Sequence, residues 1–509
     1  MFLNKFILAS IVALVIWLFT KWYRIKTFWI KKGVPQCPTY PIIGSMTFLQ
    51  RINPNVWLKD VYQRYSSPYV GMWVFWRPGL IINSPTLARN ILVKDADNFR
   101  NRLLGTGKKH DLGSLNMFLV DDPLWTSIRR RLTSVFTAAK LRGWQELYRS
   151  KSADLVERIK SDNDKGVIHN LRVRCLAIRI SIKLCNIIES NKITFINRYT
   201  FLNSGGPLRA MTSEWEKYSA YRGMEWSSIF FFPELADFTH FSFSLWPKHT
   251  MDYFEKIFNM IVQERGGYEK ETSGKRDLMD ALLKMKQEAK DDQNINEMVV
   301  ISNALIFLQG GYDTSSTTLS YLIYELAHHP FHQVMKIYDE VMEAKTKIGD
   351  RELEINDLAE LPFLNAVLKE TMRKYPIMGW LDRLALNDYQ VDDHVTIPAG
   401  TVVYINVNGM QRDPKLFPDP DEFKPERFLP ENEKDIVPYS YLPFGEGPRS
   451  CIGKRFGLYS LRFALSSIVS NFAVKPLPNA LKPNDIAVEN KGLFYLPRDV
   501  LSVDFVPRN

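Results

Sequence analysis

Cys451 and its neighbours have the residue types and spacing best suited to chemistry. They form the run Phe444-Gly445-Glu446-Gly447-Pro448-Arg449-Ser450-Cys451-Ile452-Gly453. The glycines permit tight turns and a close approach of the backbone to a flat ligand. Backbone N–H groups, the charge of Arg449 and the dipole of a helix expected to begin near Gly453 all stabilise a thiolate. A buried structural cysteine is the alternative, but the loop and the arginine favour a stabilised thiolate at Cys451.

The other cysteines are Cys37, Cys175 and Cys185, and none belongs to a Cys-x-x-Cys pair. This spacing argues against a zinc site. Nothing suggests a disulfide framework, so we expect the body of the protein in a reducing compartment. Cys37 lies in a proline-rich loop with no candidate partners, and we exclude it as a ligand.

A long apolar segment, Met298 to Leu326, predicts one helix with Gly310 and Gly311 in its middle. Each glycine costs a helix about 1 kcal/mol relative to alanine. Two explanations are open at this point. The glycines permit close packing of another helix, or they leave room for something large beside the backbone.

The elements that position these residues belong to a large globular domain. The chain has 509 residues, of which 45% are hydrophobic and 24% charged. Helical periodicity dominates from Trp57 onward, and strand-like runs occur at Tyr69–Phe75, Gly79–Ile82 and Thr401–Val407. The predicted fold class is mainly α with a minor β portion.

Residues 1–21 predict a single N-terminal transmembrane helix that acts as a membrane anchor. Residues 6–20 carry no charge, which is near the short end for a membrane span. A cleaved signal peptide is the competing explanation, but no small-x-small cleavage site follows. Basic residues are more frequent after the apolar run than before it, so the remainder should be cytosolic. Residues 22–44 form a basic, proline-rich linker, and residues 45–509 the catalytic domain.

The net charge is +10, and the basic residues are spread along the whole chain. No basic block interleaved with aromatic residues suggests nucleic-acid binding. A basic surface suits an anionic membrane or an acidic protein partner instead.

The chain resembles the cytochrome P-450 family, whose signature is Phe-x-x-Gly-x-Arg-x-Cys-x-Gly. Phe444, Gly447, Arg449, Cys451 and Gly453 match every fixed position. The resemblance extends from the anchor to the C-terminus, and its details look most like insect microsomal members. It implies the cytochrome P-450 fold and haem b, with the axial thiolate on iron supplied by Cys451.

The resemblance also implies further cofactor-binding residues. Trp125 and Arg129, four apart on one helix face, correspond to a pair that reaches a haem propionate. Three more arginines resemble the other propionate partners, and for each arginine a solvent-facing charge is the alternative. The complete implied cofactor-binding set is Arg102, Trp125, Arg129, Gly311, Arg383, Phe444, Arg449, Cys451 and Gly453.

The run from Gly310 to Ser315 resembles the oxygen-activation motif of the family, with Gly310 where alanine is more usual. Thr314 is expected to hold the protons of bound oxygen, and Asp313 to relay protons from water. A separate cluster of Glu370, Arg373 and Arg427 is expected to be buried and to serve folding and haem retention.

The implied function is a monooxygenase that inserts one oxygen atom into a lipophilic molecule, in xenobiotic detoxification. The alternatives are oxidation of an endogenous hormone or lipid, a reductase-independent isomerase or dehydratase, and an inactive product. No Gly-x-Gly-x-x-Gly follows a strand, so NADPH-cytochrome P-450 reductase is the expected partner, with a second small haem protein as a further donor. The expected location is the endoplasmic reticulum membrane, with the catalytic domain on the cytosolic side. Candidate pocket residues are Leu115, Phe118, Phe307, Met378 and Phe494.

The stretch 167–211 departs from the family, because charges are scattered where a core helix is expected. A shifted reading frame or missplicing is one explanation, and natural divergence is the other. Further on, seven aromatic residues suggest a second membrane contact or core packing: Phe230, Phe231, Phe232, Phe238, Phe241, Phe243 and Trp246.

Overall fold

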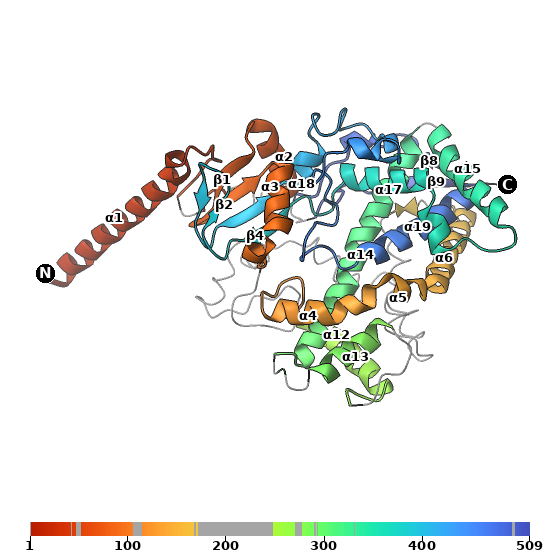
Figure 1. Cartoon of the computed structure of the whole chain (residues 1–509), viewed down its shortest axis with the longest axis horizontal. Helices are drawn as coiled ribbons and strands as arrows, with labels where there is room; N and C mark the ends of the chain where they lie inside the picture. Colours follow the sequence, from red (N-terminus) through yellow and green to blue (C-terminus); the bar gives the residue numbers. More distant parts are fainter. Residues whose placement is uncertain are drawn as a thin grey trace.

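The computed structural model describes residues 2–41, 43–46, 52–104, 114–166, 169–171, 248–269, 277–289, 292, 294–329, 331–490 and 494–508. Within these residues the chain is mainly helical with a minor β portion, as predicted (Figure 1). Most of the stretch 167–211, the aromatic cluster at 230–246, Cys175 and Cys185 lie outside the described residues. Of the departing stretch, His169–Asn170 forms strand β3, and Leu171 is buried.

Strands from distant parts of the chain form the sheet nearest the N-terminus. Strand β1 (Tyr69–Val74) pairs antiparallel with β2 (Arg77–Ile82), Tyr69 opposite Ile82. Strand β2 pairs parallel with β7 (Val402–Ile405), which pairs antiparallel with β4 (Leu381–Leu384). The three strand-like runs predicted from the sequence are therefore confirmed.

The other strands form two smaller sheets. Strand β9 (Ser502–Pro507) lies between β3 and β8 (Phe472–Pro476). Strands β5 (Tyr389–Gln390) and β6 (Thr396–Ile397) pair with each other.

Helix α14 (Glu297–His328) runs through the middle of the helical part (Figure 1), which confirms the predicted long helix. The Asn296 side chain caps its start by accepting a hydrogen bond from the N–H of Val299. The helix contacts α13 (Leu278–Glu288), α17 (Pro362–Lys374), α19 (Lys454–Asn471) and β8. It therefore forms the axis of the main hydrophobic core, in which Leu322 is fully buried.

The remaining helices surround α14 or cover the first sheet (Figure 1). Their bounds are α2 Pro54–Arg64, α3 Pro85–Arg89, α4 Leu124–Thr133, α5 Ala138–Arg142, α6 Gln145–Asp164, α12 Lys248–Glu264, α13 Leu278–Glu288, α15 Phe331–Ile348, α16 Ile355–Ala359, α17 Pro362–Lys374, α18 Val407–Gln411 and α19 Lys454–Asn471.

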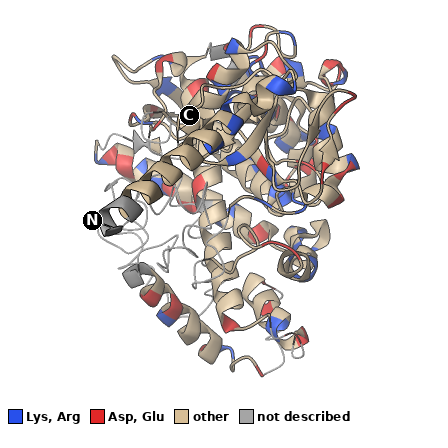
Figure 2. Cartoon of the chain, turned by 90° about the vertical axis from the view of Figure 1, so that its left-hand side faces the viewer, with Lys and Arg blue, Asp and Glu red and all other residues tan. Residues whose placement is uncertain are grey.

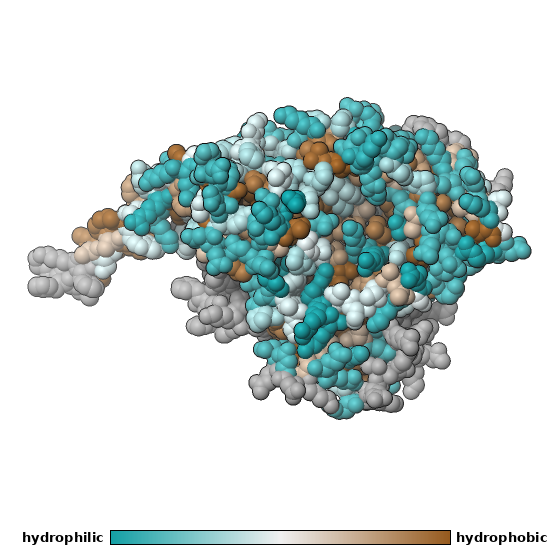
Figure 3. Space-filling view, in the orientation of Figure 1, coloured by the Kyte–Doolittle hydropathy of each residue, from teal (hydrophilic) through white to brown (hydrophobic). Residues whose placement is uncertain are grey.

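Helix α1 (Phe2–Lys31) projects from the body as an arm (Figure 1). Its segment Ile7–Lys31 is long and apolar enough to cross a membrane, and Figure 3 shows hydrophobic surface along the arm. The helix continues past residue 21, where the sequence suggested that the anchor ends. Its last turns pack on β1, where Ile25 and Trp29 are buried.

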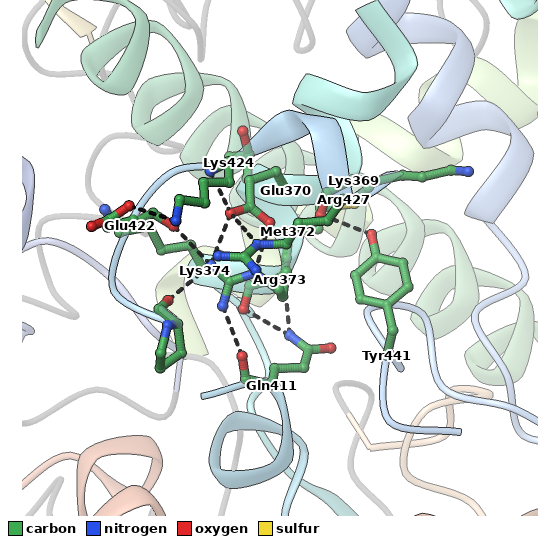
Figure 4. A network of polar contacts seen from close by, with 12 residues as sticks. Lys369, Glu370, Met372, Arg373, Lys374, Gln411, Glu422, Lys424, Arg427 and Tyr441 are labelled. Carbon is green, nitrogen blue, oxygen red and sulfur yellow. Dashed lines mark hydrogen bonds and ion pairs between the residues drawn. The ribbon is translucent and has the colours of Figure 1, made fainter. Parts of the chain in front are cut away.

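A buried ion-pair cluster fastens α17 to the segment that precedes the cysteine loop (Figure 4). Arg373 donates to both carboxylate oxygens of Glu370, at 2.7 and 2.9 Å, and both side chains are fully buried. Arg373 also donates to the backbone carbonyls of Gln411, Pro420 and Glu422. The Arg427 Nε lies 3.4 Å from a Glu370 oxygen. The predicted structural cluster is confirmed.

Candidate active site

Cys451 lies in a loop held by its own backbone immediately before α19. Its N–H donates to the carbonyl of Phe444 at 2.9 Å, and its side chain is exposed. Helix α19 begins at Lys454, with Gly453 as its N-cap. The thiol therefore lies at the N-terminal end of an 18-residue helix, whose dipole favours the thiolate.

The glycines of this loop differ in what they allow. Gly445 and Gly447 have φ of +64° and +76°, which favour glycine. A Cβ on Gly447 would lie 1.8 Å from the carbonyl oxygen of Leu92. Gly447 thus permits a tight turn and a close contact with another backbone segment, while the close approach to a flat ligand stays a prediction. At Gly453 a Cβ would lie 3.9 Å from the Cys451 sulfur, an ordinary contact.

Arg449 is fixed by two backbone carbonyls and an indole ring. Its Nε donates to the Arg100 carbonyl at 2.7 Å, and its Nη2 to the Val120 carbonyl at 3.0 Å. Its guanidinium lies 4.1 Å from the ring centroid of buried Trp125. Its Nη1 is buried without an acceptor among the described residues. Trp125 therefore supports Arg449 from one side, while one nitrogen of Arg449 remains available for an anion.

Arg102 and Arg383 complete the same cationic group. The Nε and Nη1 of Arg102 are buried without an acceptor in the described parts of the chain. Arg383 donates to the backbone carbonyl of Asp382 at 2.7 Å. Burial and the charge of Arg102 lower the pKa of Arg383 to about 9, and the same two causes lower that of Arg449 to about 9. Three positive charges are thus close together without enough negative charge beside them.

Arg129 lies one turn from Trp125 on α4, as its spacing predicted. Burial lowers its pKa, the nearby Cys451 thiolate opposes this change, and Arg102 reinforces it. The structure therefore brings Arg129, Arg102 and Cys451 within electrostatic reach of one another. Trp125, Arg449 and Arg383 join this group through the contacts described above.

Sequence reasoning missed the acidic residues that position this group. Asp121 accepts from the N–H of Arg102 at 3.2 Å, and Asp382 accepts from the N–H of Leu103 at 3.1 Å. Asp122 pairs with Arg100, whose Nη2 donates to Thr126 at 2.7 Å. Asp122, with Pro123 after it, is an acidic helix start that the sequence does indicate, but Asp121 and Asp382 lie on separate segments and belong to no motif that could have identified them.

The middle of α14 is uncovered although its ends are buried. Gly310 is exposed, and Gly311, Asp313 and Thr314 are half-buried. A Cβ on Gly310 would meet no described atom within 4 Å. No helix among the described residues packs closely against Gly310, so the described part of the structure favours open space beside it. The Thr314 hydroxyl donates to the Gly310 carbonyl at 2.7 Å, so its lone pairs remain available as acceptors.

The five candidate pocket residues are apolar and at least partly buried. Asn303 of α14 accepts from the N–H of Met117 at 3.0 Å and donates to the Leu115 carbonyl at 3.2 Å. The centroid of the Phe118 ring lies 4.6 Å from the guanidinium carbon of Arg102. Leu115 and Phe118 are therefore fixed between α14 and the cationic group, whereas Met378 and Phe494 come from other segments.

Comparison with known proteins agrees with this arrangement. A model of the family described as Cytochrome P450 matches residues 35–499. The chain belongs to the cytochrome P450 family. It is 30% identical to Cytochrome P450 6l1 of Blattella germanica, over 92% of each chain. It is also 29% identical to Probable cytochrome P450 6g2 of Drosophila melanogaster, over 94% of this chain and 95% of that one.

Membership of the family implies a haem-thiolate cofactor and supports monooxygenase activity. The residues present fit such a group. Buried guanidinium nitrogens that lack acceptors in the described part of the chain suit the propionate carboxylates, and an exposed thiol at a helix N-terminus suits iron.

Proposed function

We propose that this chain is a microsomal haem-thiolate monooxygenase that inserts one atom of dioxygen into a lipophilic small molecule. One observation carries the proposal. Buried arginine nitrogens that have no acceptors among the described residues lie near the cysteine loop, which provides an exposed thiol. Such nitrogens are costly in an interior unless an anionic group binds them.

The haem would be held at its iron and at its propionates. Cys451 would bind the iron, and Arg102, Arg383 and Arg449 would bind the propionates, with Arg129 and Trp125 beside them. Phe444, Gly453 and Gly311 would flank the ring. When bound, the haem supplies dioxygen binding and the oxidising power, and the thiolate donates electron density that favours O–O cleavage.

The protein's own residues would deliver protons and exclude water. The Thr314 hydroxyl, anchored on the Gly310 carbonyl, would hold a proton at its oxygen. Asp313, the preceding residue on α14, would pass protons from water to that position. The uncovered backbone at Gly310 leaves room for a diatomic ligand beside the hydroxyl. Once the haem covers this section, the buried apolar residues of α14 on either side would limit the access of bulk water.

The substrate would be apolar, because the five candidate pocket residues are apolar. Detoxification of foreign compounds is the proposed role, and oxidation of an endogenous hormone or lipid is the alternative. The Asp313-Thr314 pair favours a monooxygenase over an isomerase or dehydratase, which has less need of proton delivery to oxygen. An inactive product depends on the stretch 167–211, most of which lies outside the described residues.

Electrons would come from NADPH-cytochrome P450 reductase, with a second small haem protein as a further donor. Lys454 and Arg455 are exposed three and four residues after Cys451, where an acidic partner could dock. Helix α1 would anchor the chain in the endoplasmic reticulum membrane with the catalytic domain in the cytosol.

The test is reconstitution of the full-length chain with the reductase, NADPH and a panel of lipophilic compounds under labelled dioxygen. We expect oxidised product that contains one labelled oxygen atom and forms only when NADPH and reductase are present. Product that forms without either component, or that contains oxygen from water, would contradict the monooxygenase assignment.

A further inference from the structure

The last turns of α1 are held against the body by the indole of Trp29, which fits closely onto strand β1. Trp29 is fully buried, and its Nε1 donates to the Met72 carbonyl at 3.0 Å. A Cβ on Gly71 would lie 2.4 Å from the indole Cγ of Trp29. Gly71 therefore makes the room that the indole occupies on strand β1, and a larger residue there would expel it.

The chain that follows α1 is fastened to the same strand. It reverses at Gly33, where φ is +68°, and the Val34 N–H donates to the Trp29 carbonyl at 3.0 Å. Cys37 then donates to the Gly71 carbonyl, and Gly71 donates to Pro35, each at 2.8 Å. Because helix and linker both bind β1 within a few residues, no flexible segment separates α1 from the sheet.

Two contacts stiffen this junction further. The Phe28 ring meets Trp73 of β1 edge-on, with centroids 5.6 Å apart. The Lys32 ammonium donates to the Thr396 carbonyl of β6 at 3.0 Å. The arm is therefore supported by two sheets, and its direction relative to the catalytic body is fixed.

Lys21 contacts both the apolar run of α1 and the body of the protein, so it fixes the depth of one point on the body relative to the apolar run. It is the first charged residue after the apolar run, and its ammonium lies 4.8 Å from the Trp17 ring and 4.7 Å from the Trp76 ring. Trp17 belongs to the apolar run, whereas Trp76 is in the turn between β1 and β2 and is 39% exposed. One helical turn, about 6 Å, separates Trp17 from Lys21 along the arm. The polar headgroup layer on each side of a bilayer is about 5–8 Å thick. Trp76, whose ring contacts the Lys21 ammonium, therefore lies at the depth of this layer.

The charged residues on the arm and at the hairpin turn are all basic. Lys21, Arg24, Lys26, Lys31 and Lys32 lie on the arm, and Arg77 follows Trp76. No acidic residue precedes Asp60. Figure 2, which views the molecule from this side, shows basic residues where the arm meets the body. Tryptophan and basic residues are typical of the layer between hydrocarbon and water, and anionic headgroups attract such clusters.

We propose that α1 and the β1–β2 hairpin form one rigid unit, and that Trp76 and Arg77 at the hairpin turn lie in the headgroup layer of an anionic membrane. This inference rests on the membrane anchoring in the proposed function and deepens it. The tilt of the catalytic body is set by the Trp29 junction, not by a flexible linker.

The test places a photoreactive benzophenone side chain at position 76 of the full-length chain. The chain is reconstituted in phosphatidylcholine vesicles with and without phosphatidylserine, and lipid adducts are measured by mass spectrometry. The control probe is at Val500, which is 69% exposed and precedes β9 by two residues. Strand β9 and the C-terminus lie at the opposite end of the molecule from α1 (Figure 1). We expect several-fold more adduct at 76 than at 500, with a further increase when phosphatidylserine is present.

Variants at the junction show whether its rigidity is the cause. Trp29→Ala should lower the adduct at 76 towards the control value while the chain still floats with vesicles, whereas Trp29→Phe should retain most of it. If Trp29→Ala does not fold, Lys21→Ala replaces it, and the adduct at 76 should again fall. Equal adducts at 76 and 500 on vesicle-bound chain, or an unchanged adduct in the junction variants, would overturn the inference alone. A full-length chain that does not float would overturn the anchoring as well.

Discussion

Two groups of buried arginines in this protein differ in whether their guanidinium nitrogens have hydrogen-bond acceptors. In the cluster of Figure 4, each side-chain nitrogen of Arg373 donates to Glu370 or to a backbone carbonyl. In the group near Cys451, nitrogens of Arg102 and Arg449 are buried without acceptors among the described residues. Both groups lie in the interior of one domain, yet only the first is complete by itself.

The difference indicates which group serves the fold and which serves a ligand. A buried charge is tolerated only when it is paired and hydrogen-bonded. Glu370 provides the pair for Arg373, so this cluster stabilises α17 and the segment before the cysteine loop. Asp121 lies 3.8 Å from Arg449, and Asp382 lies beside Arg383, yet nitrogens of Arg102 and Arg449 remain without acceptors among the described residues. The haem propionates would supply those acceptors. The second group should therefore be costly in the haem-free chain and favourable in the loaded one.

Breaking the complete cluster should have the largest effect. Arg373→Ala leaves the Glu370 carboxylate buried without its partner, which costs about 3–5 kcal/mol. That is a large part of a typical margin of about 5–15 kcal/mol. We expect little folded protein and little bound haem, measured as yield and haem content. The control is Lys369→Ala on the same helix, whose exposed pair with Glu433 should cost less than about 1 kcal/mol.

Removing a charge from the incomplete group should separate haem binding from stability. The folded-state pKa of Arg383, about 9, lies below that of an unfolded arginine, so its charge destabilises the haem-free fold at every pH below about 9. Arg383→Met should therefore leave the haem-free chain as stable, or more stable by on the order of 1 kcal/mol. The same variant should lose haem more readily. Thermal unfolding without haem and haem transfer to an acceptor protein measure the two effects, and a variant destabilised in both states would show that Arg383 is structural.

A smaller effect is expected at Thr314, which touches neither arginine group. Thr314→Ala should consume NADPH nearly as fast as the parent, but product per NADPH should fall by roughly tenfold, with peroxide released instead. Thr318→Ala is a matched control, because its hydroxyl makes the same kind of bond one turn further on, to the Thr314 carbonyl at 2.8 Å. Equal coupling in the two variants would remove Thr314 from the proposed proton path.

The smallest effect is expected from chemical labelling of the cysteine thiols in the haem-free chain. Burial raises the pKa of Cys37 to about 12, so its thiol stays protonated and unreactive at neutral and mildly alkaline pH. Cys451 is exposed beside arginines and should be alkylated first. Peptide mapping after brief treatment with iodoacetamide measures both, and haem should protect Cys451. Faster labelling of Cys37 would contradict the contrast between the two environments.

The sequence predicts what is local in the chain. The cysteine loop, the Glu370–Arg373 pair three residues apart and the Trp125–Arg129 pair four apart are each contained in one segment, so spacing alone reveals them. The carbonyls of Gln411 and Pro420 that complete the Arg373 cluster are backbone atoms, which carry no residue-specific signal.

Contacts between segments that are distant in the chain could not be predicted from the sequence, because no local spacing indicates them. The Leu92 carbonyl that Gly447 contacts lies more than 300 residues earlier in the chain, so the sequence could not reveal this contact. Helix α1 continues to Lys31 because Trp29 fits beside Gly71 on β1, a tertiary contact. Hydropathy shows only where the apolar run ends, at Lys21.

The central claim is that Cys451 supplies the thiolate to the haem iron. The most direct test is the carbon monoxide difference spectrum of the reduced full-length chain, compared with that of Cys451→Ser. We predict the band characteristic of thiolate ligation in the parent and its complete loss in the variant, although the variant retains its far-ultraviolet circular dichroism. A Cys451→Ser protein with an unchanged thiolate band would contradict the account.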